Sequence, residues 1–248
     1  MGSALDPEYG EQYRALYKRH WWWRAREEML VGELRERLPQ KLGLSILDVG
    51  CGDALFFEQL RQFGDVEGVE SDSGLVDPGG PNRARVIVAP FDACFQPGRK
   101  YDLILMLDVL EHLDVPEEAL RHALSLLKPG GIVVVTVPAF KMLWTQHDRL
   151  NNHRTRYTKD SFSFLAKFAG MQVLASRYFF TWLSAAKLAT RMKEALLPSR
   201  PRIPRIPPPL INGFLYLISR VEEKLFRRLR LPVGSSLLVV GTRISEKV

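Results

Sequence analysis

Short runs of apolar residues alternate along the chain with segments whose apolar positions recur at helical spacing. The apolar runs predict seven strands, at residues 45–49, 66–69, 85–89, 101–107, 132–137, 171–178 and 236–242. The helical patterns between them lie at residues 55–63, 116–127 and 159–169. Strands that alternate with helices indicate an α/β fold with a parallel, doubly wound sheet.

Two segments interrupt this alternation. Residues 8–38 read as one helix ended by Pro39, and the unusual run HWWWRAR lies in its middle. Residues 180–232 hold an apolar stretch, a proline cluster and a second helix. We therefore predict an N-terminal helical cap (1–44), a core (45–179 and 233–248) and a helical insertion between strands six and seven (180–232).

The second helix of the insertion is amphipathic. Its apolar stripe consists of Ile211, Phe214, Leu215, Ile218, Leu225 and Leu229. Four basic residues lie mostly off that stripe: Arg220, Lys224, Arg227 and Arg228. An exposed apolar stripe is unfavourable in water, so we expect it to meet the core, another subunit or a membrane. Basic residues beside an apolar stripe suit an anionic membrane surface, and a helix packed on the core is the alternative.

The charge is concentrated in the same segment. The net charge is +7, and residues 187–230 hold eleven Lys or Arg against three Glu. This patch indicates an acidic partner (phospholipid headgroups, a phosphorylated substrate or nucleic acid) or a solvated helix face. Two cysteines, Cys51 and Cys94, and the absence of a signal-peptide pattern favour a cytoplasmic protein. Apolar runs are shorter than the ~18 residues of a membrane span, which leaves surface association open.

The strongest motif is ILDVGCGDALF, residues 46–56. A buried strand brings Asp48 to the carboxyl edge of the sheet, where α/β proteins bind ligands. Gly50 and Gly52 allow a sharp turn and a close approach of the backbone to a ligand. Leu55 stands where the dinucleotide pattern G-x-G-x-x-G/A has a small residue, which argues against a dinucleotide site.

This motif resembles motif I of the class I S-adenosylmethionine-dependent methyltransferases, with Ala54 where the family usually has a third glycine. HWW-x-R-x-R, VLEHL and LWTQHDRLNNHRTRYT look like a bacterial small-molecule subgroup of that family. The resemblance implies a Rossmann-like seven-stranded sheet with an antiparallel last strand. It covers about residues 45–180 and the final strand, and residues 73–84 are too short for the family's usual helix.

The resemblance also implies S-adenosylmethionine as the cofactor and a set of cofactor-binding residues. Glu70 ends strand two, where the family has an acidic residue that binds the ribose hydroxyls. Asp92 and Ala93 match the residues that contact the adenine amino group and ring nitrogen. Arg26 is a candidate partner of the cofactor's carboxylate, and the indoles beside it could form a lid or simply pack the helix. The full expected set is Asp48, Gly50, Cys51, Gly52, Glu70, Asp92, Ala93, Leu107 and Arg26.

Methyl transfer is an in-line displacement in which the protein aligns the acceptor, excludes water and sometimes removes a proton. The catalytic candidates are His112 and His147, with His153 as a further histidine, and each could instead be structural. Histidines favour an oxygen of a small-molecule or lipid-linked acceptor. Asp108, Glu111 and His112 resemble a metal-binding E-x-x-E-H arrangement, but the first Glu is Asp and we expect no metal.

Two other classes of function remain open at this point. The basic insertion would suit a nucleic-acid methyltransferase, but no N/D-P-P-Y/F motif follows strand four, so nucleic acid is the less favoured acceptor. A non-catalytic module that only binds the cofactor is the other class. The polar cluster of residues 144–157 on the acceptor side argues against it. No oligomeric state is predicted.

Overall fold

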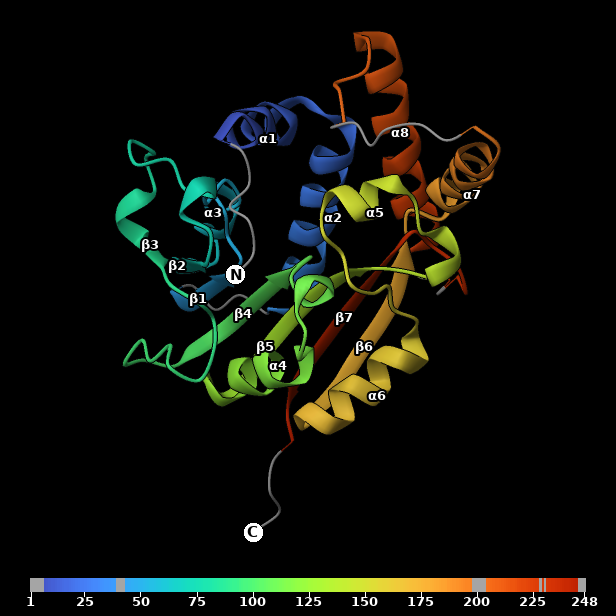
Figure 1. Cartoon of the computed structure of the whole chain (residues 1–248). Coiled ribbons are helices and arrows are strands. Elements are labelled where there is room, and N and C mark those ends of the chain that lie inside the picture. The colour runs from blue at the N-terminus through green and yellow to red at the C-terminus, as the bar shows by residue number, and fades with distance from the viewer. Residues whose placement is uncertain (1–6, 39–42, 198–203, 228, 230, 245–248) are drawn as a thin grey trace. The chain divides into compact units, whose positions relative to one another are not determined.

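The computed structural model describes residues 7–38, 43–197, 204–227, 229 and 231–244, and seven strands form one sheet in the order β3-β2-β1-β4-β5-β7-β6 (Figure 1). The strands are β1 (Leu44–Val49), β2 (Gly64–Glu70), β3 (Val86–Val88), β4 (Tyr101–Leu107), β5 (Leu127–Pro138), β6 (Met171–Phe179) and β7 (Ser236–Arg243). β1 pairs in parallel with β2, and β2 with β3, whereas β7 is antiparallel to β5 and β6. This confirms the predicted Rossmann-like fold with an antiparallel last strand.

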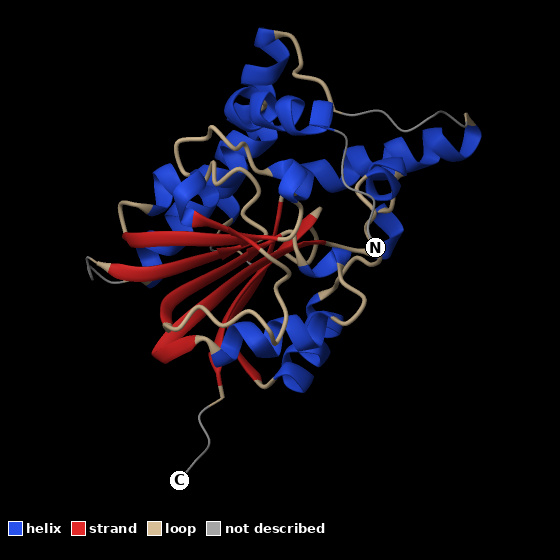
Figure 2. Cartoon of the chain, turned by 60° about the vertical axis from the view of Figure 1, so that its left-hand side comes forward, coloured by secondary structure: helices blue, strands red, loops and turns tan. Residues whose placement is uncertain are grey.

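The helices are α1 (Pro7–Arg19), α2 (Trp21–Arg37), α3 (Phe57–Leu60), α4 (Pro116–Ser125), α5 (Gln146–Leu150), α6 (Lys159–Ala169), α7 (Thr181–Leu196) and α8 (Pro209–Phe226). Figure 2 separates them from the strands by colour. Short 3₁₀ helices are η1 (Ser73–Leu75), η2 (Arg83–Arg85), η3 (Leu110–His112) and η4 (Lys141–Leu143). Between β2 and β3 the chain forms only η1 and η2, so the usual helix is missing there, as predicted.

The chain divides into two compact units. Unit 1 comprises Met1–Leu105, Leu126–Gly131 and Arg205–Leu217, and unit 2 comprises Met106–Ser125, Ile132–Pro204 and Ile218–Val248. Strands β4 and β5 and helix α8 contribute residues to both. The cap, core and insertion expected from the sequence follow a different division, which stays a prediction.

In unit 1, the single helix predicted for residues 8–38 is wrong, because the chain breaks at His20. The backbone of His20 is extended, and its Nδ1 accepts the N–H of Trp22, which caps α2. Asn212 of α8 brackets the break: its Oδ1 accepts from the Trp21 N–H at 2.9 Å, and its Nδ2 donates to the Arg19 carbonyl at 2.9 Å. The expected end at Pro39 lies outside the described residues.

The predicted helix at residues 55–63 is also too long. Only Phe57–Leu60 is α-helical, because hydrogen bonds between residues three apart, such as Phe57 N–H to Ala54 O, form tight turns around it. Lys128–Gly131, expected as a turn, belongs to β5. There the Lys128 Nζ binds the Asp102 carboxylate at 2.7 Å.

In unit 2, helices α4 and α6 pack side by side (Figure 1). Thr158 caps α6, and Gly170 ends it in the left-handed conformation. Helix α7 begins on a carboxylate from α8: the N–H groups of Thr181 and Trp182 donate to the two oxygens of Glu222 at 2.7 and 2.8 Å. An anion at a helix N-terminus is stabilising, so this contact fixes where α7 starts.

Candidate functional site

The glycine-rich loop after β1 is shaped by left-handed backbone. Gly50, Gly52 and Ala54 have φ of +69°, +52° and +54°. The Gly52 N–H donates to Glu70 Oε2 at 2.9 Å, which joins the end of β2 to the loop. Three left-handed residues within five turn the chain sharply at the carboxyl end of β1, where the sequence predicted the cofactor loop.

Glu70 is buried, and its carboxylate is held by backbone donors. Oε2 accepts from Gly52, and Oε1 accepts from the Asp72 N–H at 2.9 Å. Oε1 also lies 3.4 Å from the Ser71 hydroxyl, a contact that a ribose hydroxyl would replace, and Oε2 has a further lone pair. The arrangement therefore presents a fixed anion with acceptor capacity left for two hydroxyl donors, as a ribose would supply.

Asp48 is 4% exposed at the end of β1. Burial raises its pKa to about 7, the nearby Arg26 cation opposes this, and the Glu70 carboxylate adds to it. Arg26 comes from α2, where its guanidinium lies 5.3 Å from the centre of the Trp22 ring. Asp48, Glu70 and Arg26, all named from the sequence, thus lie close enough to one another for their charges to interact.

Gly68 on β2 was not singled out in the sequence, yet it makes room for the loop. A Cβ atom at Gly68 would lie 2.4 Å from the Cys51 Sγ and 2.9 Å from the Phe57 ring. These distances are shorter than real contacts allow, so any side chain at this position would displace Cys51. A glycine within a strand pattern is the sequence signal for such a close approach.

Asp53 is a second residue that the sequence analysis missed. Its carboxylate accepts from Arg14 of α1 at 3.1 Å and from the Asp77 N–H at 2.8 Å. It therefore ties the glycine-rich loop to α1 and to the irregular segment after β2. Its place inside the GCGD turn was a usable signal, because a short acidic side chain in a turn commonly accepts backbone N–H groups.

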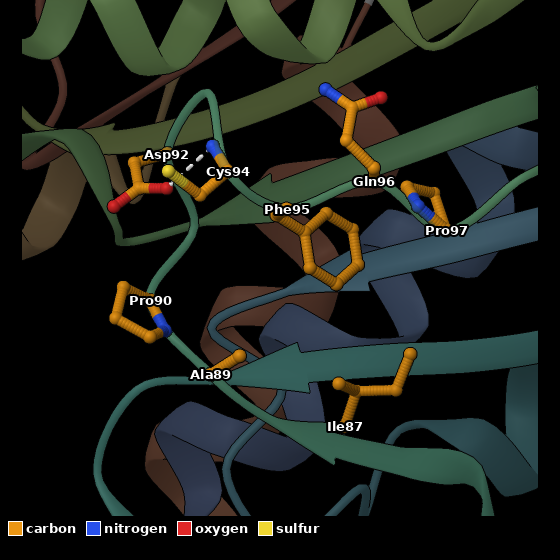
Figure 3. A pocket seen from close by; sticks show the side chains of 8 residues that line it. All are labelled: Ile87, Ala89, Pro90, Asp92, Cys94, Phe95, Gln96 and Pro97. Carbon is orange, nitrogen blue, oxygen red and sulfur yellow. Dashed lines mark hydrogen bonds between the residues drawn. The ribbon is translucent and has the colours of Figure 1, made fainter.

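Asp92 lines a cavity of about 320 Å³ in unit 1 (Figure 3). The other lining residues are mostly apolar: Ile87, Ala89, Pro90, Cys94, Phe95, Gln96 and Pro97. Asp92 Oδ1 accepts the Cys94 N–H at 2.8 Å, which leaves Oδ2 for another donor. Ala93 is exposed and does not line this cavity, so the structure does not bring the two expected adenine residues into one pocket.

Unit 2 holds the remaining expected residues, and strained backbone marks the strand ends there. Leu107 is half-buried as the last residue of β4. Non-glycine residues with positive φ directly follow Leu107 and lie near the ends of β5 and β6: Asp108 (+58°), Phe140 (+56°) and Phe180 (+56°). Such residues cost about 1–3 kcal/mol each and cluster at functional sites. Asp108 is held by Thr136, whose Oγ1 donates to its Oδ1 at 3.0 Å.

Asp148 is the centre of a buried ionic network. The Arg156 guanidinium binds both of its oxygens, at 2.7 and 2.9 Å, and the His153 Nδ1 lies 2.9 Å from its Oδ1. Burial alone would raise the pKa of Asp148, but these partners hold it well below its usual range. The Arg156 side chain is fully buried and also donates to the Ala139 carbonyl at 2.9 Å.

His153 in turn contacts His112. The two rings meet edge to face with centroids 4.9 Å apart. Desolvation and His153 lower the pKa of His112 to about 4, so its imidazole is neutral at pH 7. The structure thus connects His112, His153 and Asp148, whereas the sequence named His112 with His147.

Donor atoms for a metal ion also meet here. Among the described residues, Glu111, His112 and His153 offer one ligand atom each within 4.8 Å of one another, a spacing that one cation could bridge. Asp108 is not part of this group, although the motif spacing had suggested it. The expectation that no metal binds stays a prediction.

His147 is exposed on α5, and its Nε2 lies 3.1 Å from the Asn151 amide nitrogen. Partial desolvation and the neighbouring Lys187 ammonium lower its pKa to about 4. Lys187 of α7 is half-buried, and desolvation and the Arg156 cation lower its pKa to about 8. The sequence analysis missed Lys187, although a single cation in an apolar stretch was a usable signal.

A family model described as a methyltransferase domain matches residues 22–194. The chain belongs to this methyltransferase family. The match confirms the class I resemblance, the enzyme class and S-adenosylmethionine as the cofactor of the class. It covers the glycine-rich loop, Glu70 and the histidine cluster.

Curated relatives of this methyltransferase are named ubiquinone biosynthesis O-methyltransferase. The protein of Bordetella bronchiseptica is 28% identical over 150 residues, which cover 53% of this chain and 61% of the relative. The Bordetella avium protein is 30% identical over 147 residues, covering 52% and 60%. The chain thus matches about three-fifths of the length of these relatives.

Solved structures share the fold of this methyltransferase. One belongs to a complex between the Haloferax volcanii Trm112 methyltransferase activator and a methyltransferase, with a TM-score of 0.60, 17% identity and coverage of 97% and 96% of the two chains. Another is a TehB-like S-adenosylmethionine-dependent methyltransferase from Corynebacterium glutamicum, with a TM-score of 0.56, 17% identity and coverage of 96% and 100%. At these identities the likeness concerns the fold alone.

Proposed function

We propose that this protein transfers the methyl group of S-adenosylmethionine to an oxygen of a small-molecule or lipid-linked acceptor. The observation that carries the choice of oxygen is the chain His112–His153–Asp148. A hydroxyl must lose its proton as it accepts a methyl group, and an imidazole oriented by a second group can take it. The names of the curated relatives, which are O-methyltransferases, support the same choice.

Residues of unit 1 bind the cofactor in this proposal. Glu70 accepts the two ribose hydroxyls, Gly50, Cys51 and Gly52 supply close backbone, and Asp48 faces the positive end of the ligand. Asp92 accepts from the adenine amino group through its remaining oxygen, with Ala93 contacting the ring. Arg26 binds the carboxylate. Leu107 belongs to unit 2 and stays an expectation from the family resemblance. The cofactor itself supplies the reactive methyl group and its leaving group.

The proton-transfer role is tested with histidine variants. Labelled S-adenosylmethionine is first incubated with lipid, small-molecule and nucleic-acid extracts to find the acceptor. His112→Ala should then lower kcat by roughly 10²–10⁴-fold with cofactor affinity nearly preserved, and His153→Ala should lower it less, through lost positioning. His147→Ala tests the alternative base, and His122→Ala on α4 is the matched control.

Two outcomes would reject the proposal. Label in nucleic acid alone would support the nucleic-acid alternative, and no transfer to any extract, with the cofactor bound, would support a non-catalytic module. If His112→Ala and His122→Ala retain the same rate on the identified acceptor, His112 is a structural residue.

We further propose that α8 rests on an anionic membrane surface. One face of α8 exposes Leu210, Phe214, Leu217, Val221 and Leu225, with exposed fractions between 46% and 89%. Leu215 and Ile218, which the sequence placed on the same stripe, lie on the more covered side. Of the four basic residues that the sequence placed beside the stripe, Lys224 is exposed, Arg220 and Arg227 are half-buried, and Arg228 lies outside the described residues. None of the helices in the described part of the chain has the length and apolar character needed to cross a bilayer.

Flotation with liposomes tests this surface. Wild type should float with anionic vesicles at low salt and not with neutral ones. Phe214→Glu with Leu217→Glu should abolish flotation, whereas Phe164→Glu with Phe168→Glu on α6, which are equally exposed aromatic positions, should not. Failure of wild type to float, or a stable dimer that buries α8, would overturn the membrane assignment.

A further inference from the structure

A second cavity lies within unit 2 and plays no part in the function described so far. Its volume is about 490 Å³, within the range of small-molecule sites. The lining residues are Lys141, Trp144, Thr145, Gln146, Arg149, Arg154, Arg191, Glu194 and Ala195. Four cations and one carboxylate line the cavity, and one of the cations, Arg154, is paired with Asp114 outside the lining.

Hydrogen bonds hold the walls of this cavity together. Arg191 of α7 donates to the carbonyls of Lys141 and Met142 at 3.1 and 2.7 Å. Glu194, one turn further along α7, accepts the Gln146 N–H at 3.0 Å. These contacts join α7 to η4 and α5. The same contacts occupy the side chains of Arg191 and of Glu194, the one carboxylate in the lining.

The other three cations differ in what they contact. Arg154 forms an ion pair with Asp114, and its Nε donates to the His112 carbonyl at 2.9 Å. Lys141 and Arg149 are exposed, and within the described part of the chain their side chains make no hydrogen bond or ion pair. Two uncommitted cations therefore border one cavity from separate elements, η4 and α5.

We propose that this cavity binds a phosphate or diphosphate group carried by the acceptor. The four cations, less Glu194 and the Asp114 that pairs with Arg154, leave a formal charge of +2, which a multiply charged oxyanion matches better than a single carboxylate does. An arginine fork and a lysine ammonium are the side chains that commonly bind phosphate oxygens. Trp144 is half-buried in the wall and offers an apolar surface to the part of the acceptor next to the anion.

The position of the cavity connects it with methyl transfer. Arg154, in the wall of the cavity, donates its Nε to the His112 carbonyl at 2.9 Å, which joins the cavity to the segment that carries the proposed base. The inference rests on the proposed function only in naming the ligand as the methyl acceptor. The binding of the anion itself is independent of catalysis.

The test uses calorimetry with the full chain and two probes, inorganic phosphate and pyrophosphate, without cofactor. Wild type should bind pyrophosphate more tightly than phosphate. Lys141→Gln with Arg149→Gln should weaken pyrophosphate binding by about 10-fold or more. Lys167→Gln with Lys193→Gln, two exposed lysines that do not line the cavity, removes the same charge and should leave binding unchanged.

Vesicles separate the two sources of the anion. Binding to vesicles containing phosphatidic acid that is lost in the Lys141/Arg149 variant identifies a lipid phosphate, and binding of free pyrophosphate alone identifies a soluble one. Either result supports the site. Absence of binding in both arms, or equal loss in the Lys167/Lys193 control, overturns it. Cofactor binding measured on the same samples shows separately whether the methyltransferase site is intact.

Discussion

Two buried aspartates, one in each unit, have opposite electrostatic surroundings. Asp48 lies near the end of β1, and burial raises its pKa to about 7. Asp148 is no more exposed, yet Arg156 and His153 hold its pKa well below the usual range. Asp148 is already neutralised by the protein, whereas Asp48 has only the opposing field of Arg26. A buried carboxyl group that the protein has not neutralised suits a positively charged ligand such as S-adenosylmethionine.

The largest effect on stability is expected from removing Asp148, the aspartate whose charge the protein already neutralises. Asp148→Ala leaves the fully buried Arg156 cation without its partner, so the free energy of unfolding should fall by about 3–5 kcal/mol. Urea denaturation measures it. Asp65→Ala removes an exposed ion pair with Arg85 and should cost less than about 1 kcal/mol. Equal losses in the two variants would show that the buried network does not stabilise unit 2.

A change at Glu70 should lower the affinity for the cofactor rather than the free energy of unfolding. Glu70→Ala removes the carboxylate held by the Gly52 and Asp72 N–H groups, and cofactor affinity should fall by about 1.5–3 kcal/mol. Calorimetry on the folded variant measures this. Glu58→Ala, an exposed carboxylate on α3, is the control. Unchanged affinity for Glu70→Ala would remove Glu70 from the ribose site.

Because the pKa of Asp48 is raised, the stability of the cofactor-free protein should depend on pH. Its folded pKa lies above the unfolded value of about 3.9, so the folded state binds the proton more tightly. Its contribution to the free energy of unfolding is therefore greatest below pH 4 and is lost as the pH rises to about 7. Asp48→Asn should flatten this slope in denaturation curves collected from pH 4 to 8. A variant with the same slope as wild type would contradict the raised pKa.

The smallest effect concerns the strained loop. Ala54→Gly relieves a left-handed alanine but gives the unfolded chain more freedom, so the net change in stability should stay below about 1 kcal/mol. Gly52→Ala places a side chain at nearly the same φ and should destabilise by about 1 kcal/mol. Thermal denaturation of both variants checks the pair. A large gain from Ala54→Gly would mean that the strain is greater than the backbone angle indicates.

The sequence predicted what short-range patterns determine. Strand β4 and helix α6 were placed with their correct ends, because a continuous apolar run and a glycine at the end of a helix, Gly170, are local signals. The loop with Gly50 and Gly52 was predicted because the residues that allow its sharp turn lie next to one another in the sequence. What the sequence could not predict depends on contacts between distant residues.

The break at His20 is one such case. It is bracketed by Asn212, which lies 191 residues from Trp21 in the chain. The pairing of Asp148 with His153 and Arg156 is another, because five basic residues within positions 147–156 offered several equivalent pairings: His147, Arg149, His153, Arg154 and Arg156. Lys187 lies near this network because of the way α7 packs, and no periodic pattern in the sequence predicts that packing.

Cys51 has a consequence for the chemical durability of the cofactor loop. S-adenosylmethionine is an alkylating agent, and a thiolate would be a far better nucleophile toward it than a thiol. Burial, together with Asp48 and Glu70, raises the pKa of Cys51 well above its ordinary value, so the sulfur stays protonated. Burial, with a smaller contribution from the two carboxylates, thus keeps the loop thiol in its less nucleophilic form, and we expect this to slow its methylation and oxidation.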